Sequence, residues 1–484
     1  MTRDLALLLP EITVAVAALL GLMVMLTRET PRTAERFTWI AAALALGLTL
    51  VISVRLQAGG ALLLGSFHDD SFARLIKVLL LLTGATLALI ALRSLDGLGL
   101  MKPDLPILLA LAALGGMVIA SAGDLLILAL GLEILSAALY ALSRTRLGPA
   151  PQVRPWRGYR DSLLATCVTL LGIAVIAGSG GASNLDALAG GLSQGLGASS
   201  SGELPFGVLA GLALYVTGIL AKFSVGPLQL WQPETGRERP VVVVAMLDLL
   251  PKIALVAVLA RLLFTGLDPL STIWQPILAS LALVAVVFGA LAALMQTELK
   301  GLLAQTGLAQ LGLILIGLAA GGPEGLLAAM LALVLYTALQ TGGYAFAATL
   351  TSDGRPMTAL SALVGYVSHA PARTLAVLLI LLGLSGAPPL VGYAAKIALL
   401  FAASSGGWLW LAIAAFAAFL ACVAVYLRLA IQLASGEDEE ILDTRFDVLP
   451  VAIVMVAASV SVIGAFTLLG LDDLAWQAAE SLAR

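Results

Sequence analysis

The stretch LAKFSVGPLQLWQPETGRERPVVVVAMLDLLPK, residues 220–252, places charged residues and helix breakers inside otherwise apolar sequence. Lys222 lies in one apolar segment just before a Gly-Pro pair, and Asp248 and Lys252 lie in the next segment beside a proline. A lysine in hydrocarbon is costly in free energy. A proline in a membrane helix leaves backbone carbonyls that water or side chains must satisfy. The stretch therefore indicates a polar, hydrated path through a bilayer.

The composition of the whole chain is that of a membrane protein. Of its 484 residues, 60% are hydrophobic and only 11% are charged, and the mean hydropathy is +1.05. A soluble domain could not bury so much apolar surface, so we expect an all-α polytopic membrane protein. The net charge is −3 and no basic tail or patch is present in the sequence, which argues against a nucleic-acid partner.

Apolar segments of suitable length recur along the chain. Taking roughly 20 apolar residues per span, we expect about 14 transmembrane helices. The twelfth segment is too long for one straight crossing and contains GAPP at residues 386–389, so we expect two half-helices there. The first segment follows only MTRD and is interpreted as a retained span. The expected spans cover residues 5–26, 37–55, 73–92, 105–122, 124–143, 161–178, 206–225, 241–263, 273–296, 299–320, 324–349, 373–404, 407–430 and 447–470.

Basic residues in short loops set the orientation of a bacterial membrane protein. With the N-terminus outside, the arginines and lysines concentrate in the inside loops. The connection between the fifth and sixth spans alone holds Arg144, Arg146, Arg154, Arg157 and Arg160. We therefore expect a multi-pass protein of the bacterial inner membrane with both termini on the outer, periplasmic side.

Three connecting or terminal segments have distinctive compositions. Residues 179–205 are rich in glycine and serine, and we expect a flexible or weakly helical outer loop. Residues 435–447 (SGEDEEILDTRFD) form an acidic inner loop, either a solvated turn or a docking surface. Residues 472–484 are expected to form a short amphipathic helix on the outer surface.

The broken segments suggest an internal symmetry. KFSVGP at residues 222–227 breaks the seventh expected span, and GAPPLVGYAAK at 386–396 breaks the twelfth, five spans later. An odd offset inverts one unit relative to the other across the membrane. Paired broken helices in inverted repeats mark the transport path of many carriers.

Four ionisable residues at membrane depth form the candidate site: Glu133 in the fifth span, Lys222, Lys252 and Lys396. An acid followed by three lysines can pass protons, because neighbouring charges decide whether each group holds its proton. The competing interpretation for Glu133, Lys222 and Lys252 is a structural ion pair, and for Lys396 it is the capping of carbonyls at the helix break. Asp248 lies four residues before Lys252 on one helix face, and is either part of the path or only a charge partner.

The other chemically active residues have simpler interpretations. We expect Lys77 to be a snorkelling side chain near the start of the third span, and Glu11 to be interfacial. Cys167 and Cys422 are far apart in apolar segments and are interpreted as small core residues. The sequence contains no phosphate loop, dinucleotide glycine fingerprint or Cys/His cluster. We therefore expect no cofactor and no metal in this chain, and no bond chemistry.

Along nearly the whole chain, a series of motifs occurs in the same order as in a known family. They are LLPEI at residues 8–12, DDSFARLIKVLLLL at 69–82, DLLILALGLEILSAALYALS at 124–143, KFSVGPLQLWQPE at 222–234, PKIA at 251–254, LKGLLAQTGLAQLG at 299–312, LSGAPPLVGYAAK at 384–396 and VYLRLA at 425–430. Each motif alone is weak, but in this order on this hydropathy profile they are strong. They are similar to the antiporter-like membrane subunits of respiratory complex I, and within that family to subunit N of bacterial NADH–quinone oxidoreductases.

The resemblance implies two inverted five-helix repeats in which the seventh and twelfth helices are broken. Its expected division of the chain is N-terminal helices 1–3 (1–104), a first repeat (105–263), a second, inverted repeat (264–432), and the acidic inner loop with the last helix and the tail (433–484). It also implies a chain of buried charges along the middle plane of the membrane.

The resemblance also implies roles, cofactors and partners. Glu133 corresponds to the fifth-helix glutamate, Lys222 and Lys252 to the central lysines, and Lys396 to the lysine of the exit side. Quinone, NADH, flavin and iron–sulfur clusters are expected in other subunits. The expected partners are the other membrane subunits of complex I and the lipid bilayer.

The chain departs from the family at several positions. Gln229 and Gln310 stand where histidine is common. Arg157 and Arg160 lie at the start of the sixth span, where the family tends to carry a lysine. An arginine does not deprotonate readily, so a proton shuttle there would need water or other groups. Asp248 is not part of the family pattern.

Together with the buried charges, the resemblance implies a proton-translocating membrane subunit of an NADH–quinone oxidoreductase, driven by quinone reduction elsewhere in the complex. The nearest alternative is a subunit of a cation/proton antiporter or membrane-bound hydrogenase with the same fold, which co-purifying proteins would distinguish. An alternative of another class is a non-pumping structural subunit that holds adjacent membrane subunits together. A dry path between Glu133 and Lys396 would favour that scaffold.

Overall fold

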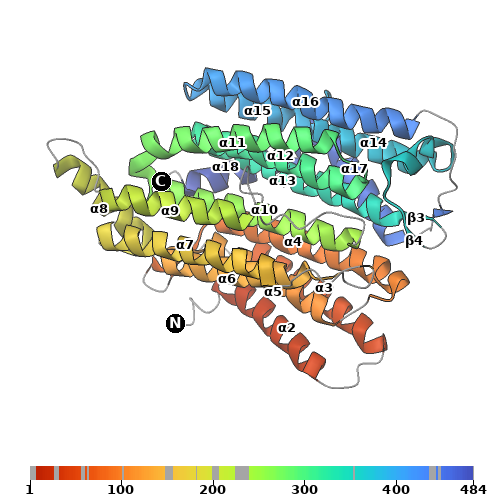
Figure 1. Cartoon of the computed structure of the whole chain (residues 1–484), viewed down its shortest axis with the longest axis horizontal. Coiled ribbons are helices and arrows are strands. Elements are labelled where there is room, and N and C mark those ends of the chain that lie inside the picture. The colour runs from red at the N-terminus through yellow and green to blue at the C-terminus, as the bar shows by residue number, and fades with distance from the viewer. Residues whose placement is uncertain are drawn as a thin grey trace.

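The computed structural model describes residues 7–26, 32–55, 60–62, 65–100, 103–145, 147, 156–180, 182–198, 206–223, 239–352, 355–434, 443–444 and 448–482. Helices lie side by side in one bundle (Figure 1), which confirms the predicted all-α fold. They are α2 (Leu9–Leu26), α3 (Arg32–Arg55), α4 (Ser71–Ser94), α5 (Asp104–Ala120), α6 (Leu125–Leu142), α7 (Trp156–Gly180), α8 (Leu185–Ala198), α9 (Phe206–Phe223), α10 (Val241–Arg261), α11 (Ser271–Leu294), α12 (Leu299–Ala320), α13 (Gly322–Thr349), α14 (Pro371–Ser385), α15 (Val391–Ser405), α16 (Leu409–Ala434), α17 (Val448–Thr467) and α18 (Leu471–Leu482).

Each span expected from the sequence coincides with a helix, and the twelfth coincides with the pair α14 and α15. Among the described residues, nine helices are long and apolar enough to cross a membrane, and six apolar helices are shorter. The expected break in the twelfth span lies at residues 386–390, between the two half-helices. The break expected at Gly226-Pro227 lies outside the described residues, which pass from Phe223 in α9 to Arg239.

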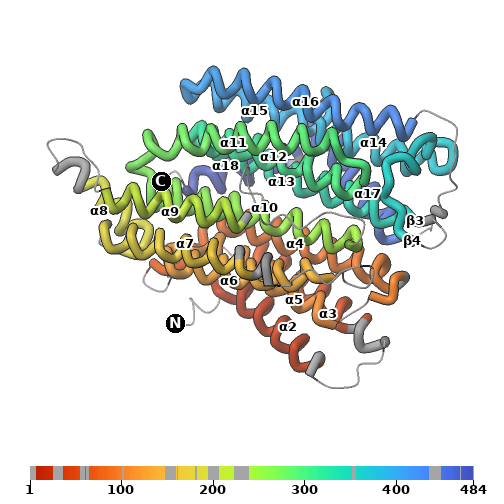
Figure 2. The backbone as a smooth tube through the Cα atoms, in the orientation of Figure 1, coloured from red at the N-terminus to blue at the C-terminus, as the bar shows by residue number. Residues whose placement is uncertain are grey.

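The most deeply buried helices are α10, α12 and α13. The apolar window of α12 is 100% buried, against 33% for α7 and for α17. Chain order runs across the bundle from α2 and α3 to α16, while α18 returns to pack against α4 and α13 (Figure 1 and Figure 2). The core therefore lies where the two halves of the chain meet, and Asp248 and Lys252 belong to it through α10.

Side chains and glycines at helix ends explain several boundaries. The Asp70 carboxylate accepts a hydrogen bond from the Ala73 N–H at the start of α4, and Asp124 does the same for Leu126 at the start of α6. Such oxygens satisfy N–H groups that have no partner within the helix. Helix α14 ends at Gly386, whose φ of 76° lies in the left-handed region that glycine adopts without strain.

Short strands and one additional helix are features that hydropathy alone did not specify. The antiparallel pairs are β1 (Gly60–Leu62) with β2 (Phe67–Asp69), and β3 (Leu350–Ser352) with both β4 (Arg355–Pro356) and β5 (Asp443–Thr444). The segment expected to be a flexible or weakly helical loop, 179–205, contains the helix α8. Apart from β5, the acidic segment 435–447 lies outside the described residues.

Helix α18 confirms the helix expected in the C-terminal tail. One face of it is buried through alanines and Leu482. The Ser481 hydroxyl accepts a hydrogen bond from the Phe72 N–H of α4 at 3.1 Å. The tail is thus packed against the helix bundle through the apolar face that the amphipathic sequence pattern predicts.

Candidate functional site

The first candidate pair joins α6 to α9. Lys222 Nζ donates a hydrogen bond to Glu133 Oε1 at 2.5 Å and another to Ser136 Oγ at 3.2 Å. The Thr166 hydroxyl of α7 donates to the other carboxylate oxygen at 3.2 Å. The Lys222 side chain is 2% exposed, whereas that of Glu133 is 40% exposed. A buried ammonium is therefore balanced by a carboxylate at the surface of the bundle.

The second candidate pair lies on one face of α10. Lys252 Nζ and Asp248 Oδ1 form a buried ion pair across one helical turn. The other carboxylate oxygen accepts hydrogen bonds from the Tyr344 hydroxyl at 3.0 Å and the Tyr336 hydroxyl at 3.3 Å, both on α13. Lys252 also donates to the Ala304 carbonyl of α12 at 3.2 Å. These additional hydrogen bonds are what allow a charge pair to remain in the interior.

Lys396 is held by backbone carbonyls. Its Nζ donates to the carbonyl oxygens of Leu384 at 2.7 Å and Ser385 at 2.8 Å, both at the end of α14. The ammonium lies 4.7 Å from the ring centroid of Phe419. Gln310 Nε2 donates to the same Leu384 carbonyl at 2.8 Å. The helix break thus provides the acceptors, as expected for carbonyls at a helix end that lack a partner within the helix.

The predicted site residues therefore fall into three groups. Glu133 pairs with Lys222, Asp248 pairs with Lys252, and Lys396 contacts no carboxylate among the described residues. Within that part of the chain, no side-chain hydrogen bond or ion pair joins one group to the next. Transfer between the groups would need water or side-chain movement.

Of the glutamines and arginines that depart from the family, one lies in the candidate site and the others do not lie there or are outside the described residues. Gln310 lies beside Lys396 and shares an acceptor with it. Arg160 is exposed on α7. The side chain of Arg157 and the whole of Gln229 lie outside the described residues.

Sequence reasoning missed the tyrosines of α13. Tyr336, Gln340 and Tyr344 recur every four residues, so they form one polar stripe on the helix. Gln340, the middle residue of the stripe, donates a hydrogen bond from Nε2 to the Leu303 carbonyl of α12 at 2.6 Å. Such a stripe in an apolar helix is a signal from which contact with a buried charge can be predicted.

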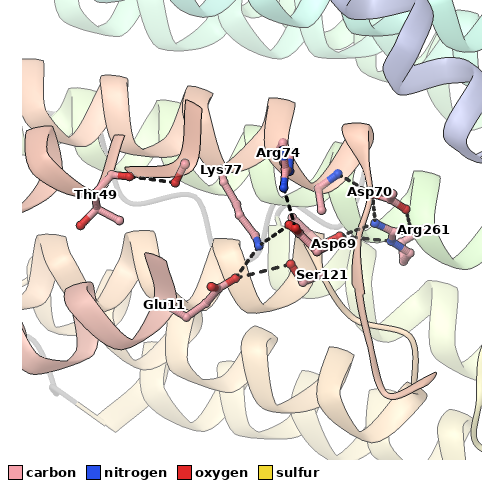
Figure 3. Close-up of polar contacts among 11 residues, drawn as sticks. Glu11, Thr49, Asp69, Asp70, Arg74, Lys77, Ser121 and Arg261 are labelled. Carbon is pink, nitrogen blue, oxygen red and sulfur yellow. Dashed lines mark hydrogen bonds and ion pairs between the residues drawn. The ribbon is translucent and has the colours of Figure 1, made fainter. Parts of the chain in front are cut away.

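A second buried charge cluster lies where α2, α4 and β2 meet (Figure 3). Lys77 Nζ lies 2.7 Å from Glu11 Oε1 and 3.5 Å from Asp69 Oδ1. Arg74 Nη2 donates to the other oxygen of Asp69 at 2.8 Å. The side chains of Lys77 and Glu11 are only 3% and 9% exposed. The expectation that Lys77 snorkels is therefore wrong, because its ammonium is buried and paired. Glu11 is buried with it, and its expected interfacial depth stays a prediction.

A bidentate ion pair beside that cluster ties α4 to α10 (Figure 3). Arg261 Nη1 and Nη2 donate to the Asp70 carboxylate at 2.6 and 2.9 Å, and Nη2 also donates to the Ala120 carbonyl at 2.6 Å. Burial alone would raise the pKa of Asp70, but the guanidinium charge and the hydrogen bonds hold that pKa below its ordinary value. The described residues contain no group of His, Cys, Asp or Glu that could hold a metal ion.

The fold and the site together define a class of protein: a polytopic membrane protein with ionisable pairs buried in its interior. Charged residues at membrane depth are costly and are typical of ion pathways. The family described as NADH:quinone oxidoreductase/Mrp antiporter, TM, matches residues 122–421, which is more than half of the chain. The chain belongs to this family, as its motifs indicate.

Individual relatives agree with this assignment. The chain is 32% identical over 488 residues to NADH-quinone oxidoreductase subunit N of Jannaschia sp. (strain CCS1), with 100% of both chains covered. A chain of respiratory complex I from Thermus thermophilus has a TM-score of 0.76 at 24% identity, covering 96% of this chain and 98% of that one. A chain of the Mrp complex from Dietzia sp. DQ12-45-1b has a TM-score of 0.81 at 20% identity, covering 100% and 98%.

Proposed function

We propose that this chain is a proton-translocating membrane subunit of a bacterial NADH–quinone oxidoreductase. A relative that aligns along its whole length carries the name of such a subunit. The observation that carries the proposal is the contact between Lys222 and Glu133. A lysine buried at span depth and held by one carboxylate can change its proton occupancy when that carboxylate moves or when the local field changes.

The proposed path runs through the three groups in sequence order. Glu133 stabilises the charged form of Lys222, and withdrawal of that carboxylate leaves an ammonium in a buried site, which favours proton release. Lys252 and then Lys396 take up the proton in turn. Asp248 acts at the second step as the counter-charge of Lys252. Redox work elsewhere in the complex drives the cycle by altering the field or the hydration around Lys222.

The redox chemistry belongs to other subunits in this proposal. They would hold the flavin and the iron–sulfur clusters and would bind NADH and quinone, while this chain moves protons. The 40% exposure of Glu133 supports an assembled form, because a carboxylate on the lateral face of a membrane protein is costly against lipid. A neighbouring membrane subunit that covers α6 would remove that cost.

The proposed location is the bacterial inner membrane, with both termini on the periplasmic side. The arginine-rich connection between the fifth and sixth spans supports this orientation, because basic loops are retained in the cytoplasm. In Figure 1, α8 and the strands β3 and β4 lie at opposite ends of the bundle, which supports the order of the spans on which this orientation is based.

Two other functions fit the same fold. A subunit of a cation/proton antiporter or membrane-bound hydrogenase would share the helices, and the fold of the Mrp chain from Dietzia sp. is similarly close. The whole-length relative named subunit N favours the oxidoreductase. A non-pumping scaffold would keep Lys222 and Glu133 only as a structural pair, and the following experiment separates it from a pump.

The test uses the assembled complex in inverted membrane vesicles, with NADH as the reductant and a pH-sensitive dye as the readout. We expect Lys222→Ala and Glu133→Ala complexes to assemble and to translocate protons far more slowly, because a proton-transfer group typically contributes roughly 10²–10⁴-fold in rate. Thr217→Ala is the control on α9, since the bond that its hydroxyl makes among the described residues goes to the Ala213 carbonyl of its own helix. Unchanged pumping by both assembled variants would overturn the proposal.

A further inference from the structure

A small cavity lies between the second and third groups of the site. Its volume is about 30 Å³, and it lies among α12, α13, α14 and α15. Its walls include Tyr336, which contacts Lys252 and Asp248, and also Gln310 and Lys396. The cavity therefore lies against Lys396 and against Tyr336, the hydrogen-bond partner of Lys252. No direct hydrogen bond joins Lys252 to Lys396 among the described residues.

The size and walls of this cavity suit water. One water needs roughly 10–15 Å³ of such space and 2–4 polar partners. The volume of about 30 Å³ is enough for one or two water molecules. Tyr336, Gln310 and Lys396 are the wall residues that carry polar side chains.

The Lys252 side of the cavity is arranged around Asp248. The Tyr336 hydroxyl lies 3.3 Å from Asp248 Oδ2 and 3.3 Å from Lys252 Nζ, so it contacts both members of the ion pair. Gly307 of α12 permits this packing, because a Cβ there would lie 2.4 Å from Lys252 Nζ and 2.7 Å from the Tyr336 hydroxyl. Tyr344 also donates to Asp248 but does not line the cavity.

We propose that Asp248, Tyr336 and water bound in this cavity form the proton connection between Lys252 and Lys396. The inference rests on the proposed function of the chain. It assigns a transfer role to Asp248 beyond that of a counter-charge, and it gives the cavity a ligand, which is water.

The transfer balances as a proton relay. The ammonium of Lys252 gives a proton to the Asp248 carboxylate, which leaves a neutral amine and a neutral carboxylic acid. The acid passes a proton to the Tyr336 hydroxyl oxygen as that hydroxyl releases its own proton to the water. The water then protonates the neutral amine of Lys396. The net change is one proton moved from Lys252 to Lys396, with Asp248, Tyr336 and the water restored.

The first arm of the test removes transfer groups while keeping their shape. In assembled complexes, we expect Asp248→Asn and Tyr336→Phe to slow proton translocation to the level of leakage. We expect Tyr344→Phe to have a smaller effect, because it leaves Tyr336 in place. Tyr215→Phe is the matched control and should pump normally, since its buried hydroxyl has no hydrogen-bond partner among the described residues.

The second arm fills the cavity without touching a titratable group. Ala332 lines the cavity one helical turn before Tyr336 on α13, so we expect Ala332→Leu to displace the water and to slow pumping as Tyr336→Phe does. Ala338→Leu on the same helix is the control, because that residue is not part of the cavity wall. A merely structural role for the pair predicts normal pumping in assembled Asp248→Asn, Tyr336→Phe and Ala332→Leu complexes.

The outcomes separate this inference from the proposed function. If Lys222→Ala and Lys252→Met stop pumping while Asp248→Asn, Tyr336→Phe and Ala332→Leu pump normally, the relay is wrong and the proposed function stands. If Lys222→Ala and Lys252→Met pump normally, both are wrong. Loss of pumping in all five assembled variants, with normal controls, supports both.

Discussion

At the scale of single residues, three lysines at membrane depth are held in three different ways. Lys222 has a partly exposed carboxylate partner on another helix. Lys252 has a buried carboxylate on its own helix. Lys396 has backbone carbonyls and an aromatic ring. Because a buried lysine is stable as a cation only where its partners compensate for lost water, each lysine responds to a different structural change.

The Asp248–Lys252 pair allows stability and pumping to be separated. We expect Asp248→Ala to lower the free energy of unfolding by roughly 3–5 kcal/mol, because it leaves a buried charge without its partner. We expect Asp248→Asn combined with Lys252→Met to recover most of that loss, yet not to pump. Thermal denaturation and proton translocation of the same purified complexes measure the two effects. Equal destabilisation by the single and double changes would contradict the pairing.

The burial of the three site lysines was predictable, whereas the 40% exposure of Glu133 and most of the partners were not. Charged residues within apolar segments reveal Glu133, Lys222, Lys252 and Lys396 directly. The Asp248–Lys252 contact followed from helical spacing, because it lies within one helix. The contact of Lys222 with Glu133 depends on which faces of α6 and α9 meet, and a single sequence does not encode that rotation in its hydropathy.

At the scale of elements, the broken twelfth span illustrates what local sequence determines. Glycine and proline at residues 386–389 end α14, and the glycine takes the left-handed conformation. The freed carbonyls of α14 then meet Lys396 from α15. By contrast, Lys77 looked like a snorkelling side chain because its partner Glu11 comes from a distant helix. Local signals identify helix ends, whereas contacts between helices decide the state of a buried charge.

The Asp70–Arg261 contact gives a prediction about how α4 and α10 are held together. We expect Asp70→Asn to destabilise the protein by roughly 3 kcal/mol, because it leaves Arg261 buried without a counter-charge. Asp96→Asn is the matched control and should change little, since the Arg36–Asp96 pair has side chains 60% and 39% exposed. Thermal denaturation at neutral pH measures both. A similar effect of the two changes would contradict the account.

The same ion pair predicts a dependence on pH. The pKa of Asp70 is lower in the folded protein than its ordinary value, so the unfolded chain binds this proton more readily. The stabilisation from Asp70 is therefore present above about pH 4, the ordinary carboxyl range, and is lost as pH falls through the lower folded value. The difference in denaturation temperature between the unaltered protein and Asp70→Asn should shrink only below that range.

At the scale of the whole molecule, the hydropathy profile predicted the order of the helices, and the motifs indicated the family. The helix order follows from the length of apolar segments that a bilayer requires, and the family follows from the motifs. The short strands and α8 lie in polar connections, where no such constraint acts. The three lysines of the candidate site are on α9, α10 and α15, so the site spans both halves of the chain.

The orientation in the membrane can be tested by labelling. Ser193 on α8 and Ser361 between α13 and α14 are both exposed and are expected on opposite sides. In a background without Cys167 and Cys422, we expect Ser193→Cys to react with an impermeant thiol reagent in intact spheroplasts. We expect Ser361→Cys to react only after the membrane is opened. The reverse pattern would contradict the proposed orientation.

The most direct test of the central claim replaces Lys222 with arginine in the assembled complex. Arginine keeps the positive charge that pairs with Glu133 but does not release its proton readily. If Lys222 carries protons, Lys222→Arg complexes in inverted vesicles should assemble, retain the denaturation temperature of the unaltered complex, and translocate protons as poorly as Lys222→Ala. If the pair is only structural, Lys222→Arg will restore proton translocation to the unaltered rate, and that result would contradict a proton path through Lys222.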